Sequence, residues 1–225
     1  MRHLVLTTAL LAAMSPLARA QAQQVAKEAD PTRKVAAGKL PAGWQVRLDD
    51  KDMNRYTAAD TKFETMGDGY HVTSGPAALY YNEAHAAPGD TYTVTATFTQ
   101  TKAPTHPEAY GIFLSGRNLA DSDKQDYAYF LVRGTGEYMV NHRAGKEIHK
   151  IIPWTKHEAV AAQDANGKAT NTLTAVFAAD SVRLSVNGTQ VAALPRDHYR
   201  NTSGVAGLRV NHNLDVHVAK FEVKK

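Results

Sequence analysis

The sequence lacks cysteine, and beyond its first twenty residues it also lacks any long hydrophobic run. No Cys occurs among the 225 residues, which excludes a disulfide framework and a lipid-anchored cysteine. After residue 20, no apolar stretch approaches the ~20 residues that a membrane-spanning helix needs. A chain of this length can bury a core without cross-links. These absences indicate a globular domain that does not span a membrane.

The net charge is small, and the motifs of several enzyme classes are missing. The formal net charge is +4, and it falls to +2 if Arg2 and Arg19 are removed with an export signal. So small and evenly spread a charge does not indicate nucleic-acid binding. The sequence also has no Gly-rich phosphate loop, no Gly-x-Ser-x-Gly elbow and no closely spaced His pair. Nucleotide-dependent, serine-hydrolase and zinc chemistry are therefore not indicated.

The N-terminus has the features of an export signal. Arg2 and His3 precede the apolar run 4–14, which is about half as long as a membrane span. The tripeptide Ala18-Arg19-Ala20 then supplies a small-x-small cleavage site. We therefore predict that residues 1–20 are a cleaved signal peptide and that the mature protein is periplasmic or secreted.

The mature chain divides into a tether and a folded domain. Residues 21–42 are polar and rich in Ala and Lys, which is typical of a flexible linker. Residues 43–225 show no second change in composition, and their number suits one domain. The sequence thus predicts a single domain over 43–225.

Alternation with a period of two dominates this domain. In residues 91–99, Thr alternates with Tyr92, Val94, Ala96 and Phe98, as in an antiparallel strand with one face on the core. Thirteen further runs are also predicted to be strands. They are 44–48, 62–66, 70–74, 78–83, 110–115, 127–133, 138–143, 147–154, 172–178, 182–186, 190–194, 205–211 and 216–223.

Turn residues separate these runs. Asn187-Gly188 is the strongest turn signal, because Asn and Gly both accept the positive φ that a two-residue type I′ hairpin requires. One segment, 155–171, is expected to be irregular or helical. So many short strands without crossover helices predict an all-β fold, an antiparallel β-sandwich of about 13–14 short strands.

The C-terminal half of the domain resembles a known fold family. The residues that carry the resemblance are Val182-Arg-Leu-Ser-Val-Asn-Gly188, the run 204–218 and Phe221-Glu-Val223. They are similar to the concanavalin A-like lectin/glucanase superfamily of laminin-G-like jelly rolls, and within it to 3-keto-disaccharide-hydrolase-like domains of exported bacterial proteins. The resemblance covers roughly 44–223. It implies a jelly roll of two curved sheets, a carbohydrate-related role, and a ligand groove on the concave sheet or at the loop rim.

One departure from that superfamily concerns catalysis. The Glu-x-Asp-x-x-Glu strand motif of family 16 glycoside hydrolases is absent from this sequence. Of the acidic residues, only Glu137 and Glu147 lie on or beside the middle strands, and neither has an Asp two positions later. The resemblance therefore supplies no catalytic residues.

Tyrosines on one predicted strand form a candidate binding platform. In 127–133, alternation places Phe130 and Val132 on the core, so Tyr127 and Tyr129 project from the other face about 7 Å apart. Phenol rings suit both the C–H face and the hydroxyls of a sugar. Ordinary cross-strand packing explains the same pattern.

Polar side chains on neighbouring strands extend this platform. In 205–211, alternation sends Leu208 and Val210 inward and Arg209 and Asn211 outward. Guanidinium and amide groups bind hydroxyl or carboxylate groups through several planar donors, although a solvated sheet face would also carry them. The predicted ligand-binding set is Tyr127, Tyr129, Arg133, Arg209, Asn211, Arg117 and Arg143.

A loop rich in carboxylates offers a candidate cation site. Asp121, Asp123 and Asp126 lie within six residues of one another, and oxygen ligands at that density suit Ca²⁺. Lys124 within the same loop opposes a bound cation, and a plain polar turn is the alternative. No other cofactor is predicted.

Two classes of function fit these features. A non-catalytic carbohydrate-binding module with a glycan or oligosaccharide partner fits the aromatic and Arg/Asn positions. A glycan hydrolase or lyase, of the glycoside-hydrolase or 3-keto-disaccharide-hydrolase kind, would need two carboxyl groups about 5–10 Å apart, for which Glu108 and Glu137 are candidates. A structural or protein-binding role in the cell envelope is a third alternative.

The signal peptide generates a testable prediction. Because Ala18-Arg19-Ala20 is the one good cleavage site after the apolar run, the mature N-terminus should be Gln21 or lie within two residues of it. Mass spectrometry of the exported protein measures this. Recovery of a chain that retains Met1 from the membrane fraction would contradict the prediction.

Overall fold

The computed structural model describes residues 35, 38–49, 56–196 and 202–225. The predicted signal peptide, 1–20, and most of the predicted tether, 21–42, lie outside these residues. Within them, no helix is long and apolar enough to cross a membrane.

The alternating sequence folds almost entirely into strands. Fourteen strands and one short 3-10 helix account for the regular structure of the described residues, and each strand overlaps one predicted from the sequence. The elements are β1 (Trp44–Leu48), η1 (Ala58–Asp60), β2 (Thr61–Met66), β3 (Gly69–Ser74), β4 (Ala78–Ala86), β5 (Tyr92–Gln100), β6 (Ala109–Arg117), β7 (Asp126–Arg133), β8 (Glu137–Ala144), β9 (Glu147–Lys156), β10 (Ala169–Phe177), β11 (Ser181–Val186), β12 (Thr189–Pro195), β13 (Val205–Val210) and β14 (Asp215–Lys224).

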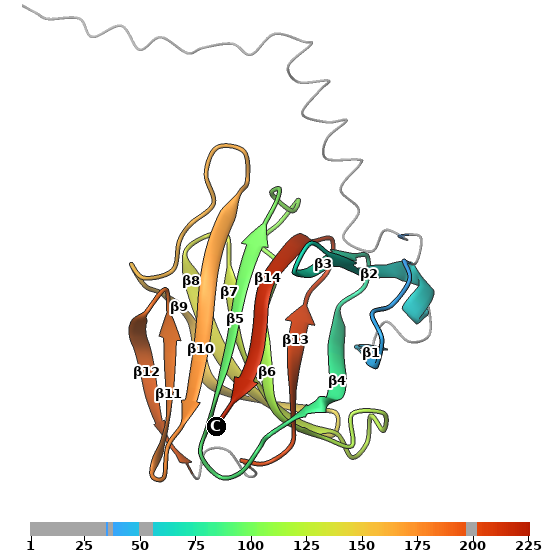
Figure 1. Ribbon diagram of the computed structural model, residues 1–225. Helices are drawn as coiled ribbons and strands as arrows, with labels where there is room; N and C mark the ends of the chain where they lie inside the picture. The colour runs from blue at the N-terminus through green and yellow to red at the C-terminus, as the bar shows by residue number, and fades with distance from the viewer. Residues whose placement is uncertain (1–34, 36–37, 50–55, 197–201) are drawn as a thin grey trace, which may run out of the picture.

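The strands form two seven-stranded sheets that pack face to face (Figure 1). Sheet A has the order β1-β4-β13-β6-β7-β8-β9, and sheet B has the order β12-β11-β10-β5-β14-β3-β2. The pairings are antiparallel throughout, for example Tyr129 opposite Asn141 and Leu173 opposite Ala96. The predicted all-β antiparallel sandwich is therefore confirmed.

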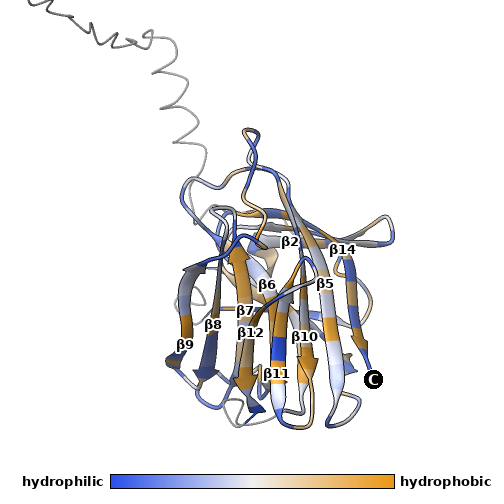
Figure 2. Cartoon of the chain, turned by 90° about the vertical axis from the view of Figure 1, so that its left-hand side faces the viewer, coloured by the Kyte–Doolittle hydropathy of each residue, from blue (hydrophilic) through white to orange (hydrophobic). Residues whose placement is uncertain are grey.

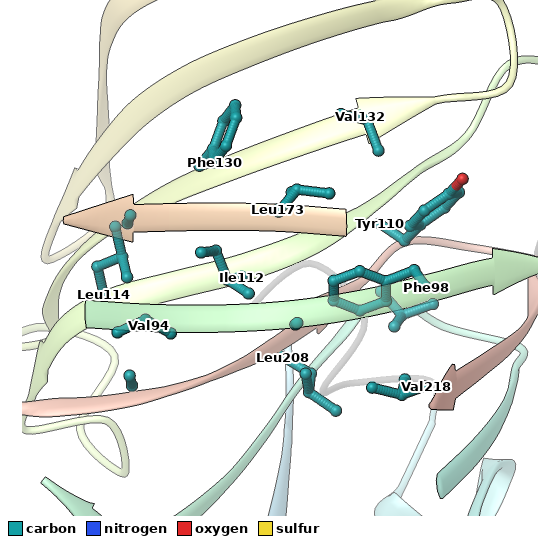
Figure 3. Packing of buried hydrophobic residues seen from close by; sticks show 14 of the residues in the cluster. Val94, Phe98, Tyr110, Ile112, Leu114, Phe130, Val132, Leu173, Leu208 and Val218 are labelled. Atoms are coloured by element: carbon teal, nitrogen blue, oxygen red, sulfur yellow. The ribbon is translucent and has the colours of Figure 1, made fainter. Parts of the chain in front are cut away.

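The core lies between the sheets, where alternate residues of each strand meet. Hydrophobic and hydrophilic residues alternate along strands such as β11 (Figure 2), so each strand turns one apolar row inward. Figure 3 shows this contact at close range. The labelled side chains are Val94, Phe98, Leu173 and Val218 from sheet B and Tyr110, Ile112, Leu114, Phe130, Val132 and Leu208 from sheet A, all of them buried.

Threonine hydroxyls cover the opposite face of β5 and β10. The threonines of the two strands stand directly opposite one another and bond across the strands. The bonded pairs are Thr95 with Thr174, Thr97 with Thr172 and Thr99 with Thr170, at Oγ1–Oγ1 distances of 3.4, 2.9 and 2.9 Å. Such pairs each stabilise a sheet by roughly 0.2–1 kcal/mol, so this face of sheet B has a structural explanation.

The predicted hairpin at Asn187-Gly188 is confirmed. The two residues connect β11 to β12 with φ angles of 51° and 83°. The Asn187 side chain also accepts from the backbone N–H of Thr172 at 2.8 Å and donates to the carbonyl oxygen of Ala159 at 2.8 Å. The turn thus fixes the hairpin register and ties it to β10.

This turn predicts the effect of a substitution at Gly188. A side chain there would meet no atom within 4 Å, so the cost of Gly188→Val comes from forcing a β-branched residue to positive φ. We expect a loss of roughly 1–3 kcal/mol in the free energy of unfolding, measured by urea denaturation. Thr189→Val, one residue later in the strand, is the control and should change stability by less than about 0.5 kcal/mol. An unchanged midpoint for Gly188→Val would contradict the prediction.

Candidate functional site

Sheet A carries a second apolar layer on the face turned away from the core. Its members come from neighbouring strands of sheet A and from one loop residue, Leu119, and they do not belong to the cluster between the sheets. They are Leu79, Tyr81, Ala109, Phe113, Leu119, Tyr127, Tyr129, Leu131 and Val205, with Met139 and Trp154 packed against them. We call this surface the sheet A face.

Aromatic rings form the centre of the sheet A face. A side chain at Gly207 would collide with the Phe113 ring and the Tyr80 carbonyl oxygen, so glycine there lets the Phe113 ring lie across β13. The aromatic floor consists of Tyr81, Phe113, Tyr127 and Tyr129, whose neighbouring ring centroids lie 6.3, 5.8 and 5.8 Å apart. Spacings in this range are those of favourable edge-to-face and offset ring contacts.

An ion pair between Arg209 and Asp49 lies on this floor. Arg209 Nη1 donates to Asp49 Oδ1 at 2.9 Å, and Nη2 donates to Oδ2 at 2.7 Å. Arg209 comes from β13, and Asp49 directly follows β1. Both side chains are almost fully buried, at 9% and 13% exposure, so this two-bond contact is the strong, desolvated kind.

The pair alters the acidity of both groups. Burial is the largest single effect and raises the pKa of the Asp49 carboxyl, but the attraction and hydrogen bonds of Arg209, together with nearby arginine charges, outweigh it and hold that pKa at about 2. Burial lowers the pKa of Arg209, whereas Asp49 raises it, with a net upward shift. The charges of Arg143 and Arg47 also help to lower the pKa of Asp49. Asp49 is therefore ionised throughout the physiological range.

Tyr129 lies at the centre of a polar network on the floor. The Arg209 guanidinium carbon lies 4.8 Å from the centroid of the Tyr129 ring, within cation–π distance. Asn141 Nδ2 donates to the Tyr129 hydroxyl at 3.1 Å. Arg209 Nε and Asn141 Oδ1 are buried and have no hydrogen-bond partner among the residues that the structure describes. One unused donor and one unused acceptor therefore lie beside the same tyrosine.

A second aromatic group lies toward the β9 edge of the face. The Arg133 guanidinium carbon lies 4.3 Å from the centroid of the Trp154 ring. Arg133 is fixed by Glu137, which accepts from Nε and from Nη2 at 2.8 Å each. These bonds, and a further one from the Thr135 hydroxyl, lower the pKa of Glu137. Trp154 is partly exposed, so part of its surface is accessible to a ligand.

The structure brings together part of the predicted site. Tyr127, Tyr129 and Arg209 contact one another, and Arg143 stands directly opposite Tyr127 in β8. Arg133 lies on the same face, at the Trp154 end. The expectation that the two tyrosines are exposed is wrong: Tyr127 is 1% and Tyr129 5% exposed, because they pack into the second apolar layer.

Two predicted residues stand apart from this group. Arg117 donates to the carbonyl oxygen of Ser203 at 3.0 Å and also to the Ser203 hydroxyl. Asn211 follows β13, its backbone N–H donates to Ala109, and its Oδ1 is buried without a partner. Among the described residues, no hydrogen bond joins either residue to the tyrosines.

Sequence reasoning missed Asp49 and Trp154. Asp49 is separated from Arg209 by 160 residues in the chain, and no local pattern relates the two. Trp154 follows Pro153 on the edge strand β9, where alternation is less regular because the β8–β9 register shifts. Its size and its place at the end of an apolar run were the available signals.

The carboxylates of the candidate calcium loop have separate partners. Asp121 pairs with Lys124 at 3.0 Å, Asp123 with Lys146 at 2.7 Å, and Asp126 with His142 at 3.2 Å. Across the part of the chain that the structure describes, no group of three or more His, Cys, Asp or Glu residues is arranged to hold a metal ion. These three carboxylates share no common centre.

Comparisons with known proteins identify the fold. No protein-family model matches the sequence, and no match to it is found among curated proteins. The carbohydrate-binding module CBM66 from Bacillus subtilis superposes with a TM-score of 0.56 and 12% identity, over 84% of this chain and 98% of that one. The carbohydrate recognition domain of Emp46p gives 0.53 in its metal-free form and 0.50 in its potassium-bound form, at 12% and 11% identity, over 81% of this chain and 88% of that one in both cases.

At such low identities these likenesses define the fold and not the activity. The fold is a jelly-roll β-sandwich like that of these two carbohydrate-binding domains, as the C-terminal sequence indicated. The finer similarity to 3-keto-disaccharide-hydrolase-like domains stays a prediction.

The Arg209–Asp49 pair predicts a pH-dependent stability difference. The Asp49 pKa is about 2 in the folded protein against an ordinary value of 3.8, so the pair contributes roughly 2 kcal/mol above pH 4 that is lost as the pH falls toward 2. Asp49→Asn should therefore have a lower free energy of unfolding than wild type at pH 7. This difference between the two proteins should shrink as the pH falls from 4 to 2.

Urea denaturation of both proteins at pH 7, 4 and 2 measures this gap. Asp215, whose pKa is also lowered by its hydrogen bond with His71, is present in both proteins and cancels in the difference. A gap of constant size from pH 7 to pH 2 would show that Asp49 does not titrate in this range.

Proposed function

We propose that this chain is a carbohydrate-binding module of an exported protein and that the sheet A face binds its glycan. The observation that carries the proposal is the partly exposed Trp154 ring with the Arg133 guanidinium over it, packed against the buried aromatic floor on one sheet of a lectin-type sandwich. Aromatic faces pack against the C–H surface of a sugar ring, while guanidinium and amide groups bond to its hydroxyls.

The charges of this face do not call for a charged ligand. Arg209 Nε can only donate, and Asn141 Oδ1 can only accept, but both atoms are buried, so a ligand on this face does not reach them. The positive charge of Arg209 is already balanced by Asp49, so Arg209 itself does not require an anionic ligand.

The carboxylates of this face favour binding over hydrolysis. A glycosidase needs one carboxyl group that stays protonated near neutral pH to act as a general acid. Asp49 and Glu137 each form two bonds with an arginine, and both have lowered pKa values. Neither suits the role of the acid. Glu108, the other carboxylate considered from the sequence, does not belong to this face. We therefore rank hydrolysis as the second candidate function.

Removal of the Trp154 ring tests the proposal. Tyr129 and Arg209 are almost fully buried, so their loss would lower stability as well as binding, whereas Trp154 is partly exposed. We expect Trp154→Ala to weaken binding about tenfold, because one stacked ring contributes roughly 0.5–1.5 kcal/mol beyond its contact area. A glycan array finds the ligand, and calorimetry measures the affinity.

The control is Met66→Ala, which removes a side chain that is 43% exposed on sheet B. It should leave the affinity unchanged. Equal affinity of wild type and Trp154→Ala for every bound glycan would remove the sheet A face from consideration. Release of reducing sugar by the purified wild-type protein would favour the hydrolase alternative.

A further inference from the structure

A pocket of about 190 Å³ lies at one end of the sandwich, where three connections meet. Its walls come from the β5–β6 loop, the β7–β8 turn and the β9–β10 loop. The lining residues are Pro104, Thr105, His106, Pro107, Glu108, Gly134, Thr135 and Gln163. We call it the rim pocket. Pockets for drug-sized molecules measure roughly 300–1,000 Å³, so this one suits a single ring-sized unit.

Glu108 is the charged group of the rim pocket. Its side chain is 11% exposed, and its Oε1 lies 3.0 Å from His106 Nε2 and 3.9 Å from His212 Nδ1. Both contacts use Oε1, so Oε2 is left to accept hydrogen bonds from a ligand. A negative group at this position repels acidic ligands and suits hydroxyl donors.

The amide of Gln163 supplies the complementary donor. Gln163 Oε1 accepts from Gln100 Nε2 at 2.8 Å, which holds the amide in place and leaves its own N–H groups to donate. Gln100 is fully buried, and its Oε1 has no hydrogen-bond partner within the described part of the chain. The rim pocket therefore combines a fixed donor and a fixed acceptor between the walls of Pro104 and Pro107.

The rim pocket adjoins the sheet A face. Thr135 lines the pocket and donates to Glu137, which in turn holds Arg133 over Trp154. Glu108 precedes Ala109, which stands opposite Arg133 in the β6–β7 pairing. Neighbouring strands are only about 4.8 Å apart. A ligand that covers Trp154 and extends across the strands from β9 toward β6 therefore reaches the pocket.

We infer that the rim pocket is a second saccharide subsite, which takes one unit of a neutral oligosaccharide whose neighbouring units lie on the sheet A face. The inference rests on the proposed function and adds the ligand class: a chain of several neutral sugar units. A single sugar contacts one subsite, whereas a longer chain occupies both, so affinity increases with chain length.

The test measures how affinity depends on chain length. The probes are maltose-type, cello-, xylo- and fructo-oligosaccharides of one to six units, titrated into the full mature chain by calorimetry and by NMR. Glu108→Gln removes the charge of the rim pocket, and Trp154→Ala removes the ring of the sheet A face. Glu222→Gln is the matched control, since that carboxylate pairs with Lys220 and Lys224 on sheet B.

We expect Glu108→Gln to weaken hexasaccharide binding about tenfold, because the hydrogen bond from the ligand is no longer made to a charged acceptor and one acceptor oxygen becomes a donor, and to leave monosaccharide binding unchanged. Glu222→Gln should match wild type for every probe. If Glu108→Gln does not fold, Gln163→Ala, at an exposed residue, takes its place with the same expectation.

Other outcomes separate the two proposals. If Trp154→Ala weakens binding but Glu108→Gln and Gln163→Ala leave the six-unit affinity unchanged, the rim subsite is wrong and the proposed function stands. If the rim pocket binds sugars while Trp154→Ala has no effect, the inference that one oligosaccharide occupies both the rim pocket and the sheet A face is wrong. If no probe binds the wild-type chain at millimolar concentration, both proposals fail for neutral saccharides.

Discussion

Arg209 lies near the middle of sheet A almost out of contact with water, and its charge can remain there because Asp49 bonds to both of its Nη atoms. A buried guanidinium without a partner would cost several kcal/mol. The pair also has a mechanical effect, since Asp49 follows the edge strand β1 whereas Arg209 belongs to β13, two positions further into the sheet. It ties the edge to the centre across β4 and keeps the guanidinium over Tyr129. The position of the Arg209 guanidinium on the sheet A face depends on this one contact.

The central strands of sheet A are buried on both faces, unlike those of a typical antiparallel sheet that has one face in solvent. In β6 eight of nine residues are buried, and in β7 six of eight are. Both rows of side chains are thus held by neighbours, one row by the core between the sheets and the other by the aromatic floor. Trp154 packs against this floor, so a ligand that contacts its exposed part causes little further loss of side-chain entropy on binding.

The fold was predictable because its signals are local. A period of two identifies a strand wherever it lies, and Asn187-Gly188 specifies its turn from two adjacent residues. Alternation also separated Phe130 and Val132 from Tyr127 and Tyr129 correctly. Alternation could not reveal that the row of Tyr127 and Tyr129 is buried as well. A two-residue period shows to which face of the sheet a side chain points, but not what packs on that face. The partnership of Arg209 with Asp49 was likewise inaccessible, because it spans 160 residues and depends on the strand order.

The paired threonines of β5 and β10 make the outer face of sheet B polar, whereas the outer face of sheet A is apolar. The threonine hydroxyls are partly satisfied by one another, and the adjacent strand β14 places Lys220 and Lys224 opposite Thr97 and Thr93 of β5. If the amines of those two lysines were coupled to a solid support, the protein would be attached by the side opposite the aromatic floor. The outer face of sheet B would then lie against the support, and the sheet A face would be turned to the solution.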